Sequence, residues 1–187
     1  MTVLPEQTTI GDKKMKETIN DILTRRSCKK YKPDMISDED IKTVVDAALA
    51  APTGRNRQSS IMLVVTDKGL RDRLSAANAR VMGAEFDPFY GAPVVIVVLA
   101  KKEVNTYIYD GSVTAENILL AAHALGLGAC WIHRAKEVFE SDEYKALLSE
   151  LGIEGEYEGI ANCTLGIPDW DELPPPLNRN DGRVFYL

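Results

Sequence analysis

The chain contains 187 residues, of which 45% are hydrophobic and 27% charged, and it carries a formal net charge of −6. This composition is typical of a globular protein with a sizeable core, and its acidity argues against nucleic acid or an anionic membrane surface as a partner. The longest apolar run, Pro93 to Ala100, is too short to span a bilayer. Three cysteines lie far apart without a C-x-x-C motif, which predicts reduced thiols in a cytoplasmic protein rather than disulfides or a zinc site.

The domain organisation follows from where periodic patterns begin. Residues 1–14 are polar and aperiodic, so we expect a flexible N-terminal extension followed by a single domain over residues 15–187. Apolar side chains then recur at helical spacing and predict a first helix that ends on a basic stretch. A capping sequence, Ser37 to Asp40, starts a second helix that ends before Pro52, and a third helix is expected over Leu70 to Val81.

Four segments are predicted to be strands. Residues 61–66 and 94–99 are continuous apolar runs rich in β-branched side chains, which indicates strands buried on both faces. Residues 129–133 and 158–167 are the other two expected strands. A short helix is predicted between them over residues 142–151.

A long helix is predicted over residues 110–125 because its sequence is apolar on nearly all sides. Such a helix must be buried in a core or in a dimer interface, and Gly126 is its expected C-terminal capping residue. His123 lies on this helix without a second metal ligand at helical spacing, so a hydrogen-bonded core histidine is favoured over a ligand. Gly126-Leu127-Gly128 follows a helix rather than opening one, so it is no dinucleotide-binding fingerprint.

The stretch Arg25-Arg26-Ser27-Cys28-Lys29-Lys30-Tyr31-Lys32 concentrates basic residues in an acidic chain. Arg25 can bind a phosphate through two parallel hydrogen bonds, Ser27 can add a hydroxyl, and Lys29 can place a point charge elsewhere on the ligand. This pattern points to a small anionic ligand. An equally good interpretation is a solvated helix C-terminus, where basic side chains complement the helix dipole.

Three further segments are candidates for ligand contact. Loop 51–58 has small and amide residues that can reach a ligand, although a plain connecting loop is favoured on composition alone. The aromatic segment 86–92 can form a lid or pocket wall, or a satellite hydrophobic cluster. After the prolines at 174–176 the tail carries two arginines and an apolar, strand-like end, a composition suited to reaching another surface.

Four motifs in these segments together resemble the nitroreductase family of FMN-dependent oxidoreductases, from about Met15 to the C-terminus. They are Arg25-Arg26-Ser27-x-Lys29-x-Tyr31, Ala51-Pro52-Thr53-Gly54-x-Asn56-x-Gln58, Pro88-Phe89-Tyr90-Gly91-Ala92-Pro93 and Leu125-Gly126-Leu127-Gly128-Ala129-Cys130-Trp131-Ile132. The resemblance implies an α+β fold, with a mostly antiparallel central sheet flanked by helices. It also implies an obligate homodimer that binds FMN at the interface, with the C-terminal arm lying on the partner subunit.

The resemblance assigns expected cofactor contacts to individual residues. The ribityl-phosphate end of FMN is expected to contact Arg25, Arg26 and Ser27, and Lys29 is expected near flavin N1 and the C2 carbonyl. A late arginine, Arg179 or alternatively Arg183, is expected to close on the phosphate. The loop of the other subunit is expected to contribute Pro52, Thr53, Gly54, Asn56 and Gln58.

The resemblance also implies how the reacting end of the flavin is surrounded. The segment Trp131, Ile132 and His133 is expected to bring a backbone N–H close to flavin N5. His133 stands where many members of the family have glycine, and its imidazole could face the substrate. The substrate pocket is expected to be formed by Phe86, Phe89 and Tyr90.

The implied activity is hydride transfer from NAD(P)H through FMN N5 to a nitroaromatic, quinone or similar acceptor by a ping-pong mechanism. This chemistry needs no side-chain nucleophile and no metal, so no catalytic residue is expected beyond the flavin, and Lys29 is expected to favour the reduced ring. Two alternatives remain open. One is a flavin-binding module for storage or sensing without turnover, and the other is a dehalogenase-like member of the family.

Overall fold

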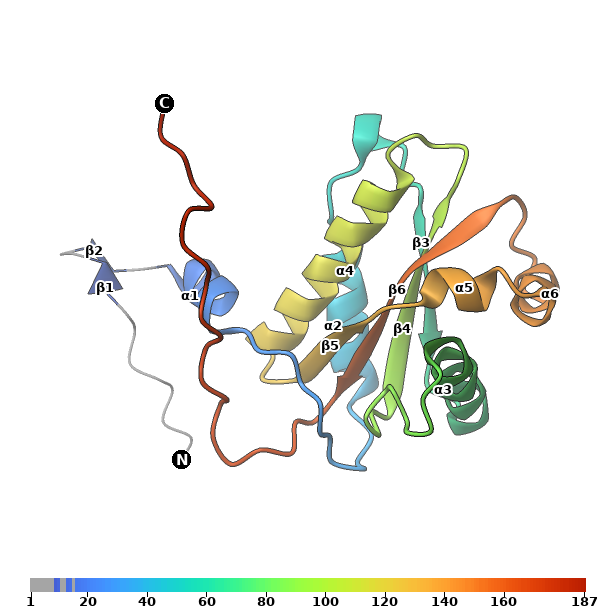
Figure 1. The fold of residues 1–187 in the computed structure, drawn as a ribbon, viewed down its shortest axis with the longest axis horizontal. Helices are drawn as coiled ribbons and strands as arrows, with labels where there is room; N and C mark the ends of the chain where they lie inside the picture. Colours follow the sequence, from blue (N-terminus) through green and yellow to red (C-terminus); the bar gives the residue numbers. More distant parts are fainter. Residues whose placement is uncertain (1–8, 11–12, 15) are drawn as a thin grey trace.

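The computed structural model of the chain describes residues 9–10, 13–14 and 16–187. At its centre lies a four-stranded sheet with the order β3-β4-β6-β5, in which all neighbouring strands are antiparallel (Figure 1). The strands are β3 (Ser60–Val65), β4 (Val94–Lys101), β5 (Gly128–Ile132) and β6 (Tyr157–Gly166). The predicted α+β fold with a central antiparallel sheet flanked by helices is confirmed.

Helices cover both faces of this sheet. One core cluster packs α2 and α4 against the first face, and a second cluster packs α3, α5 and α6 against the other. Outside both layers, α1 lies beside the C-terminal half of α4. The helices are α1 (Glu17–Thr24), α2 (Asp38–Leu49), α3 (Lys68–Met82), α4 (Tyr107–Ala124), α5 (Ala135–Phe139) and α6 (Asp142–Glu150), with a 3-10 helix, η1, at Gly54–Asn56.

Strand β4 supplies side chains to both cores, as its continuous apolar sequence predicted. Successive residues of a strand point to opposite faces, so Val94, Ile96 and Val98 enter the first cluster while Val95 and Val97 enter the second. All of them are fully buried. The same expectation, a strand buried on both faces, is wrong for residues 61–66. The strand there, β3, lies at the edge of the sheet, and Val64 is 40% exposed. An apolar run alone does not distinguish a central strand from an edge strand.

The ends of the helices follow their capping residues. Ser37 caps α2 by accepting a hydrogen bond from the Asp40 N–H at 3.0 Å, as its sequence predicted. Gly126 follows the C-cap Leu125 of α4 and has a φ of 74°, which confirms its capping role. Helix α5 was not predicted, because five residues are too few to show a helical period.

The short strands β1 and β2, helix α1 and the C-terminal arm lie on the same side of the sheet (Figure 1). Thr9–Ile10 and Lys13–Lys14 form a short antiparallel ladder; the rest of the predicted flexible extension and Met15 lie outside the described residues. Beyond Pro168 the described chain forms no regular secondary structure, so the expected strand-like end is not a strand. Phe185 and Tyr186 in this end are 80% and 95% exposed.

Candidate flavin site

The basic segment after α1 runs along the edge strand β5. Ser27 pairs with Ala129 in a parallel bridge, and the Cys28 N–H donates to the Ala129 carbonyl at 2.9 Å. The close approach requires Gly128, because a Cβ there would lie 2.8 Å from Cys28 Cβ. Tyr31 then anchors the segment through its buried hydroxyl, which lies 2.8 Å from Thr164 Oγ1. The sheet thus fixes the backbone that carries Arg25, Ser27 and Lys29.

Arg25 has a buried guanidinium nitrogen that lacks a hydrogen-bond partner. Its Nη1 is enclosed, yet no acceptor within the described part of the chain reaches it. A buried, unpaired cationic donor costs about 1–3 kcal/mol or more, so native structures rarely retain one without a ligand or water. This orphaned donor fits an anion that binds at the start of the segment, and the phosphate of FMN is such an anion.

Three predicted residues, Arg25, Ser27 and Lys29, influence the thiol of Cys130. Burial raises the pKa of Cys130, while the Ser27 hydroxyl and the positive charges of Lys29 and Arg25 act in the opposite direction. The ammonium of Lys29 lies 5.9 Å from the centre of the Tyr90 ring. Lys29 is exposed and forms no ion pair with any described carboxylate. Its charge is therefore available to a ligand.

Arg26 was expected to contact the cofactor, but the structure gives its guanidinium another role. Its Nη1 donates to the carbonyls of Leu23, Thr24 and Arg25 at the end of α1. Its Nε donates to the Pro174 carbonyl at 3.0 Å. The side chain therefore caps α1 and holds the beginning of the C-terminal arm. Sequence reasoning missed this, because the sequence does not show which of two adjacent arginines forms hydrogen bonds with its own chain.

Loop 51–58 is shaped by a buried carboxylate on α4. Asp110 accepts hydrogen bonds from the Gly54 N–H at 3.0 Å, from Ser59 Oγ at 2.8 Å and from Thr106 Oγ1 at 3.1 Å. Burial would raise the pKa of Asp110, but these hydrogen bonds outweigh burial and hold it below its ordinary value. Sequence reasoning missed Asp110, although a carboxylate in the first turn of a mostly apolar helix was an available signal.

The loop borders a cavity of about 400 Å³. Three of its residues, Arg55, Asn56 and Gln58, have positive φ values between 49° and 55°, a conformation that side chains rarely adopt and that often marks functional sites. The cavity walls include Pro52, Thr53, Asn56 and Gln58 from the predicted cofactor set. Gly54 does not line the cavity and instead packs against Thr106, where a Cβ would lie 2.4 Å from Oγ1.

The two sets of predicted FMN contacts lie at opposite ends of α4. Asp110, near the start of this helix, binds loop 51–58, whereas His123, near its end, lies 2.8 Å from Thr24 Oγ1 beside the basic segment. Thirteen residues of α-helix span about 20 Å. Figure 1 shows η1 and α1 well separated along this axis. Within one chain, therefore, the two sets do not form a single pocket.

The end of β5 reaches the surface at His133. Ile132 is buried in the second core cluster, Trp131 is half-buried, and the His133 side chain is exposed. The His133 carbonyl accepts a hydrogen bond from Asn78 Nδ2 at 2.7 Å, which fixes the backbone direction after the strand. Because the Ile132 side chain is buried, only its backbone could approach a ligand.

One of the three residues assigned to the substrate pocket is misplaced. Phe89 is fully buried in the second core cluster, where the Arg71 guanidinium lies 5.6 Å from its ring, so it cannot line a pocket. Phe86 and Tyr90 remain accessible, and their rings stack with centroids 6.4 Å apart. The alternation of aromatic residues in a turn does not reveal which ring faces inward.

The late arginines lie in the exposed arm. Neither Arg179 nor Arg183 forms a hydrogen bond or ion pair with the described part of its own chain. In Figure 1 the arm runs beside α1. The contact of either arginine with the FMN phosphate stays a prediction.

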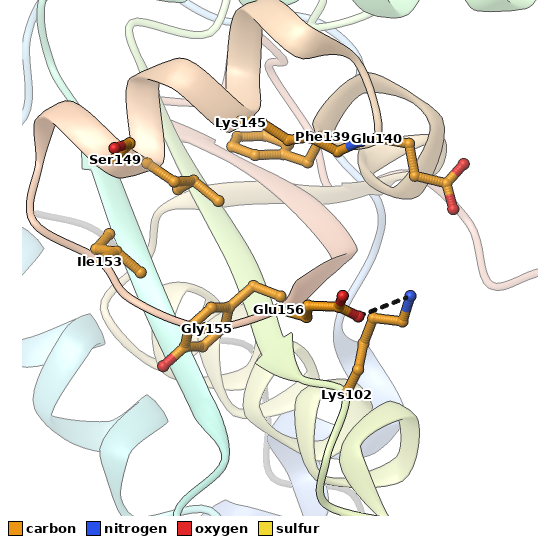
Figure 2. Close-up of a pocket in the computed structure, with 10 residues that line it drawn as sticks. Lys102, Phe139, Glu140, Lys145, Ser149, Ile153, Gly155 and Glu156 are labelled. Atoms are coloured by element: carbon orange, nitrogen blue, oxygen red, sulfur yellow. Dashed lines mark ion pairs between the residues drawn. The ribbon is translucent and has the colours of Figure 1, made fainter.

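A separate cavity of about 670 Å³ lies between α5, α6 and the start of β6 (Figure 2). Its walls include Phe139, Leu148 and Tyr157. Lys102 and Glu156 also line it, and Lys102 Nζ lies 3.7 Å from Glu156 Oε2. None of the predicted flavin contacts lines it, so we do not assign the flavin there despite its size.

No group of three potential metal ligands occurs within the described residues. His123 is hydrogen-bonded to Thr24 Oγ1, as expected of a satisfied histidine, but it is half-buried between α1 and α4 and belongs to neither core cluster. None of the described helices combines the length and the apolarity needed to cross a bilayer.

Comparison with known proteins identifies the family. The model of the nitroreductase family matches residues 22–85 and 82–167, most of the chain. The chain therefore belongs to the nitroreductase family, and the resemblance seen in its motifs is confirmed.

Individual relatives agree with this assignment. A protein of Archaeoglobus fulgidus named as an NADH dehydrogenase/NAD(P)H nitroreductase is 34% identical over 158 residues, which cover 82% of this chain and 87% of the relative. The structure of a nitroreductase with bound FMN from Desulfitobacterium hafniense is 28% identical and superposes with a TM-score of 0.80, covering 92% of this chain and 99% of the other. An FMN-dependent nitroreductase from Clostridium difficile is 30% identical with a TM-score of 0.71, covering 90% and 98%.

Proposed function

We propose that this member of the nitroreductase family is an FMN-dependent oxidoreductase that uses NAD(P)H to reduce a nitroaromatic, quinone or similar acceptor by a ping-pong mechanism. The single observation that carries the proposal is the buried Nη1 of Arg25, which has no partner among the described residues and lies on the same segment as Ser27 and Lys29. The names and bound FMN of the relatives support it. Bound FMN would supply the acceptance and donation of hydride.

The residues of the chain would bind and orient the cofactor. Arg25 would donate to the phosphate with the nitrogen that lacks a partner, and Ser27 would add a hydroxyl donor. Lys29, exposed and free of described carboxylates, would place its positive charge where the reduced ring carries negative charge. The backbone beyond Ile132, fixed by the Asn78 contact to His133, would border the ring.

A homodimer would unite the two separated half-sites. Helix α1 has no buried residue, and its apolar side chains Ile19, Ile22 and Leu23 are 46%, 50% and 56% exposed. An eight-residue helix with an exposed apolar face is marginal alone and is stabilised by packing. We infer that a second copy covers α1 and brings its loop 51–58 to the basic segment, with the arm lying on the partner.

Cofactor analysis tests the proposal directly. The purified protein should be yellow, and flavin released by heat should co-elute with FMN in chromatography. Anaerobic NADH or NADPH should bleach the visible band, and an added quinone or nitroaromatic should restore it. FAD or no flavin would contradict the proposed cofactor, and bound FMN that neither nucleotide reduces would support a storage or sensing module instead.

A further inference from the structure

The turn between α3 and β4 contains a tyrosine in a conformation that tyrosine rarely adopts. Tyr90 has a φ of 54°, in the left-handed region that favours glycine. A bulky residue persists there only where its surroundings impose the conformation, and such positions concentrate at functional sites. Tyr90 is half-buried and packs beside the cluster of Cys28, Tyr31 and Ala92.

Asp87 imposes this conformation. One carboxylate oxygen accepts from Ser75 Oγ at 2.5 Å and from the Phe89 N–H at 2.9 Å, and the other accepts from Arg71 Nη2 at 2.5 Å and from the Gly91 N–H at 2.8 Å. The two backbone donors flank Tyr90 on either side. The carboxylate thus closes the turn around Tyr90 and ties it to helix α3.

Arg71 secures the same turn from the helix. Arg71 is 8% exposed, and its Nε donates to the Ala92 carbonyl at 3.0 Å while Nη2 reaches Asp87. Its guanidinium also lies 5.6 Å from the ring centre of Phe89. Both the start and the end of the turn are therefore held by one buried cation, which leaves Tyr90 little freedom to move.

The ring presented by this turn lies under the residue proposed to face the flavin. Lys29 Nζ is 5.9 Å from the Tyr90 centroid, within cation–π range. No described carboxylate forms an ion pair with Lys29, and the Tyr90 ring is the aromatic contact of its ammonium. Phe86 stacks on Tyr90 with centroids 6.4 Å apart and supports it.

We propose that Asp87 and Tyr90 are positioning residues for the flavin reaction: Asp87 holds the strained turn, and the Tyr90 ring fixes where Lys29 presents its charge. The proposal rests on the proposed contact of Lys29 with FMN. Neither Asp87 nor Tyr90 needs to touch the reacting atoms. Their effect passes through the location of one ammonium group.

The reduction potential of the bound FMN tests this relay. Tyr90→Gly keeps the turn, because glycine adopts a positive φ without strain, but removes the ring. The preference for reduced over oxidised flavin should fall about two- to fivefold, the range of an exposed cation–π contact. For a two-electron couple this lowers the potential by about 10–20 mV, since a tenfold change corresponds to about 30 mV. Tyr90→Phe should restore it.

Two comparisons separate positioning from a general structural effect. Asp87→Asn should lower the potential as Tyr90→Gly does, whereas Asp72→Asn, which removes the other carboxylate on Arg71 without touching the turn, should not. In the double variant Lys29→Ala/Tyr90→Gly, loss of the ring should add nothing to loss of the lysine. Two results would overturn this inference but not the proposed contact of Lys29 with FMN. One is additive losses of potential in the double variant. The other is a potential that Lys29→Ala lowers but Tyr90→Gly leaves unchanged. A potential unchanged by Lys29→Ala itself would instead refute the proposed contact of Lys29 with FMN.

The contact can also be measured without flavin. Lysines of the flavin-free protein are methylated with 13C-formaldehyde, and the Lys29 signal is assigned by its absence in Lys29→Arg. The Tyr90 ring current should displace this signal, and both Tyr90→Gly and Asp87→Asn should move it to the position of a solvated lysine. A Lys29 signal identical in wild type and Tyr90→Gly would show that the ring does not hold the ammonium, and the proposal would fail.

Discussion

The guanidinium of Arg26 donates a hydrogen bond from Nε to the carbonyl oxygen of Pro174, joining residues 148 positions apart in the chain. The same side chain caps α1 through three carbonyls. The first helix and the start of the C-terminal arm are therefore one unit. A change in either should disturb the surface that we propose for dimerisation.

Truncation of the arm tests this coupling. A chain that ends at Leu173 loses both the Arg26 contact and Arg179, and we expect loss of bound FMN and of dimer stability in sedimentation experiments. Obligate interfaces typically bury more than about 2,000 Å², so folded monomer should be scarce in the intact protein. A chain that ends at Leu177 retains the Pro174 contact and serves as the control for α1. If the chain that ends at Leu173 stayed dimeric and kept its full flavin content, the arm would be needed neither for flavin binding nor for dimer stability.

Arg25→Ala should weaken FMN binding without destabilising the flavin-free protein. The lost charged hydrogen bond is worth about 1.5–3 kcal/mol, which corresponds to about a 10- to 100-fold rise in Kd. Because Nη1 has no described partner, its removal also relieves a desolvated charge, so the thermal midpoint of the flavin-free protein should not fall. Fluorescence titration with FMN and thermal unfolding measure the two effects.

Arg26→Ala is the matched control for this arginine. It should lower the thermal midpoint, since it removes four hydrogen bonds to backbone carbonyls, whereas direct loss of a phosphate contact should be absent. If Arg25→Ala lowered the midpoint more than Arg26→Ala, its guanidinium would be a structural group and not a phosphate ligand.

Lys29→Ala should impair reduction more than binding. The contacts of Arg25 and Ser27 with the phosphate remain, while the reduced ring loses its cationic partner. A charged hydrogen bond of about 1.5–3 kcal/mol corresponds to a potential lower by about 30–60 mV for a two-electron couple. Spectroelectrochemistry of the bound flavin measures this shift, and an FMN affinity that falls by a larger factor than the reduced-state preference would contradict the assignment.

His123 should make stability depend on pH. Burial lowers its pKa; nearby Asp21 opposes this, while Arg25 and Arg26 reinforce it. The unfolded chain therefore binds a proton more readily than the folded chain, so stability is fully present above the unfolded pKa of about 6.5 and is lost as pH falls toward the folded pKa. Urea unfolding between pH 7.5 and about 5 should show this slope, and His123→Gln should abolish most of it. An unchanged slope in the variant would assign the dependence to other groups.

The sequence predicted the framework better than the orientation of side chains. The central strand β4, the capped helix α2 and the turn after α4 each have a strong local signal, and all three were confirmed. The edge position of β3 and the burial of Phe89 depend on which element packs against them, and no local pattern carries that information.

The same limit applies to the candidate site. Arg25, Ser27 and Lys29 were predicted from charge and spacing, and the structure carries them on one segment that pairs with β5. Their contact with FMN stays a prediction. The carboxylates that shape the site, Asp87 and Asp110, act through contacts to residues distant in sequence or to backbone groups of a turn. Their roles follow only from the folded arrangement.

The length of α4 has a consequence for the genetics of the protein. Each chain holds its basic segment near one end of this helix and loop 51–58 near the other. In the proposed dimer every flavin therefore contacts the first half-site of one chain and the second half-site of its partner. A chain defective in Arg25 and a chain defective in Asn56, each inactive alone, would assemble into a heterodimer in which one site collects both defects and the other collects none. Co-expression of two dead alleles should then restore activity, a complementation that a protein with its whole site in one chain could not show.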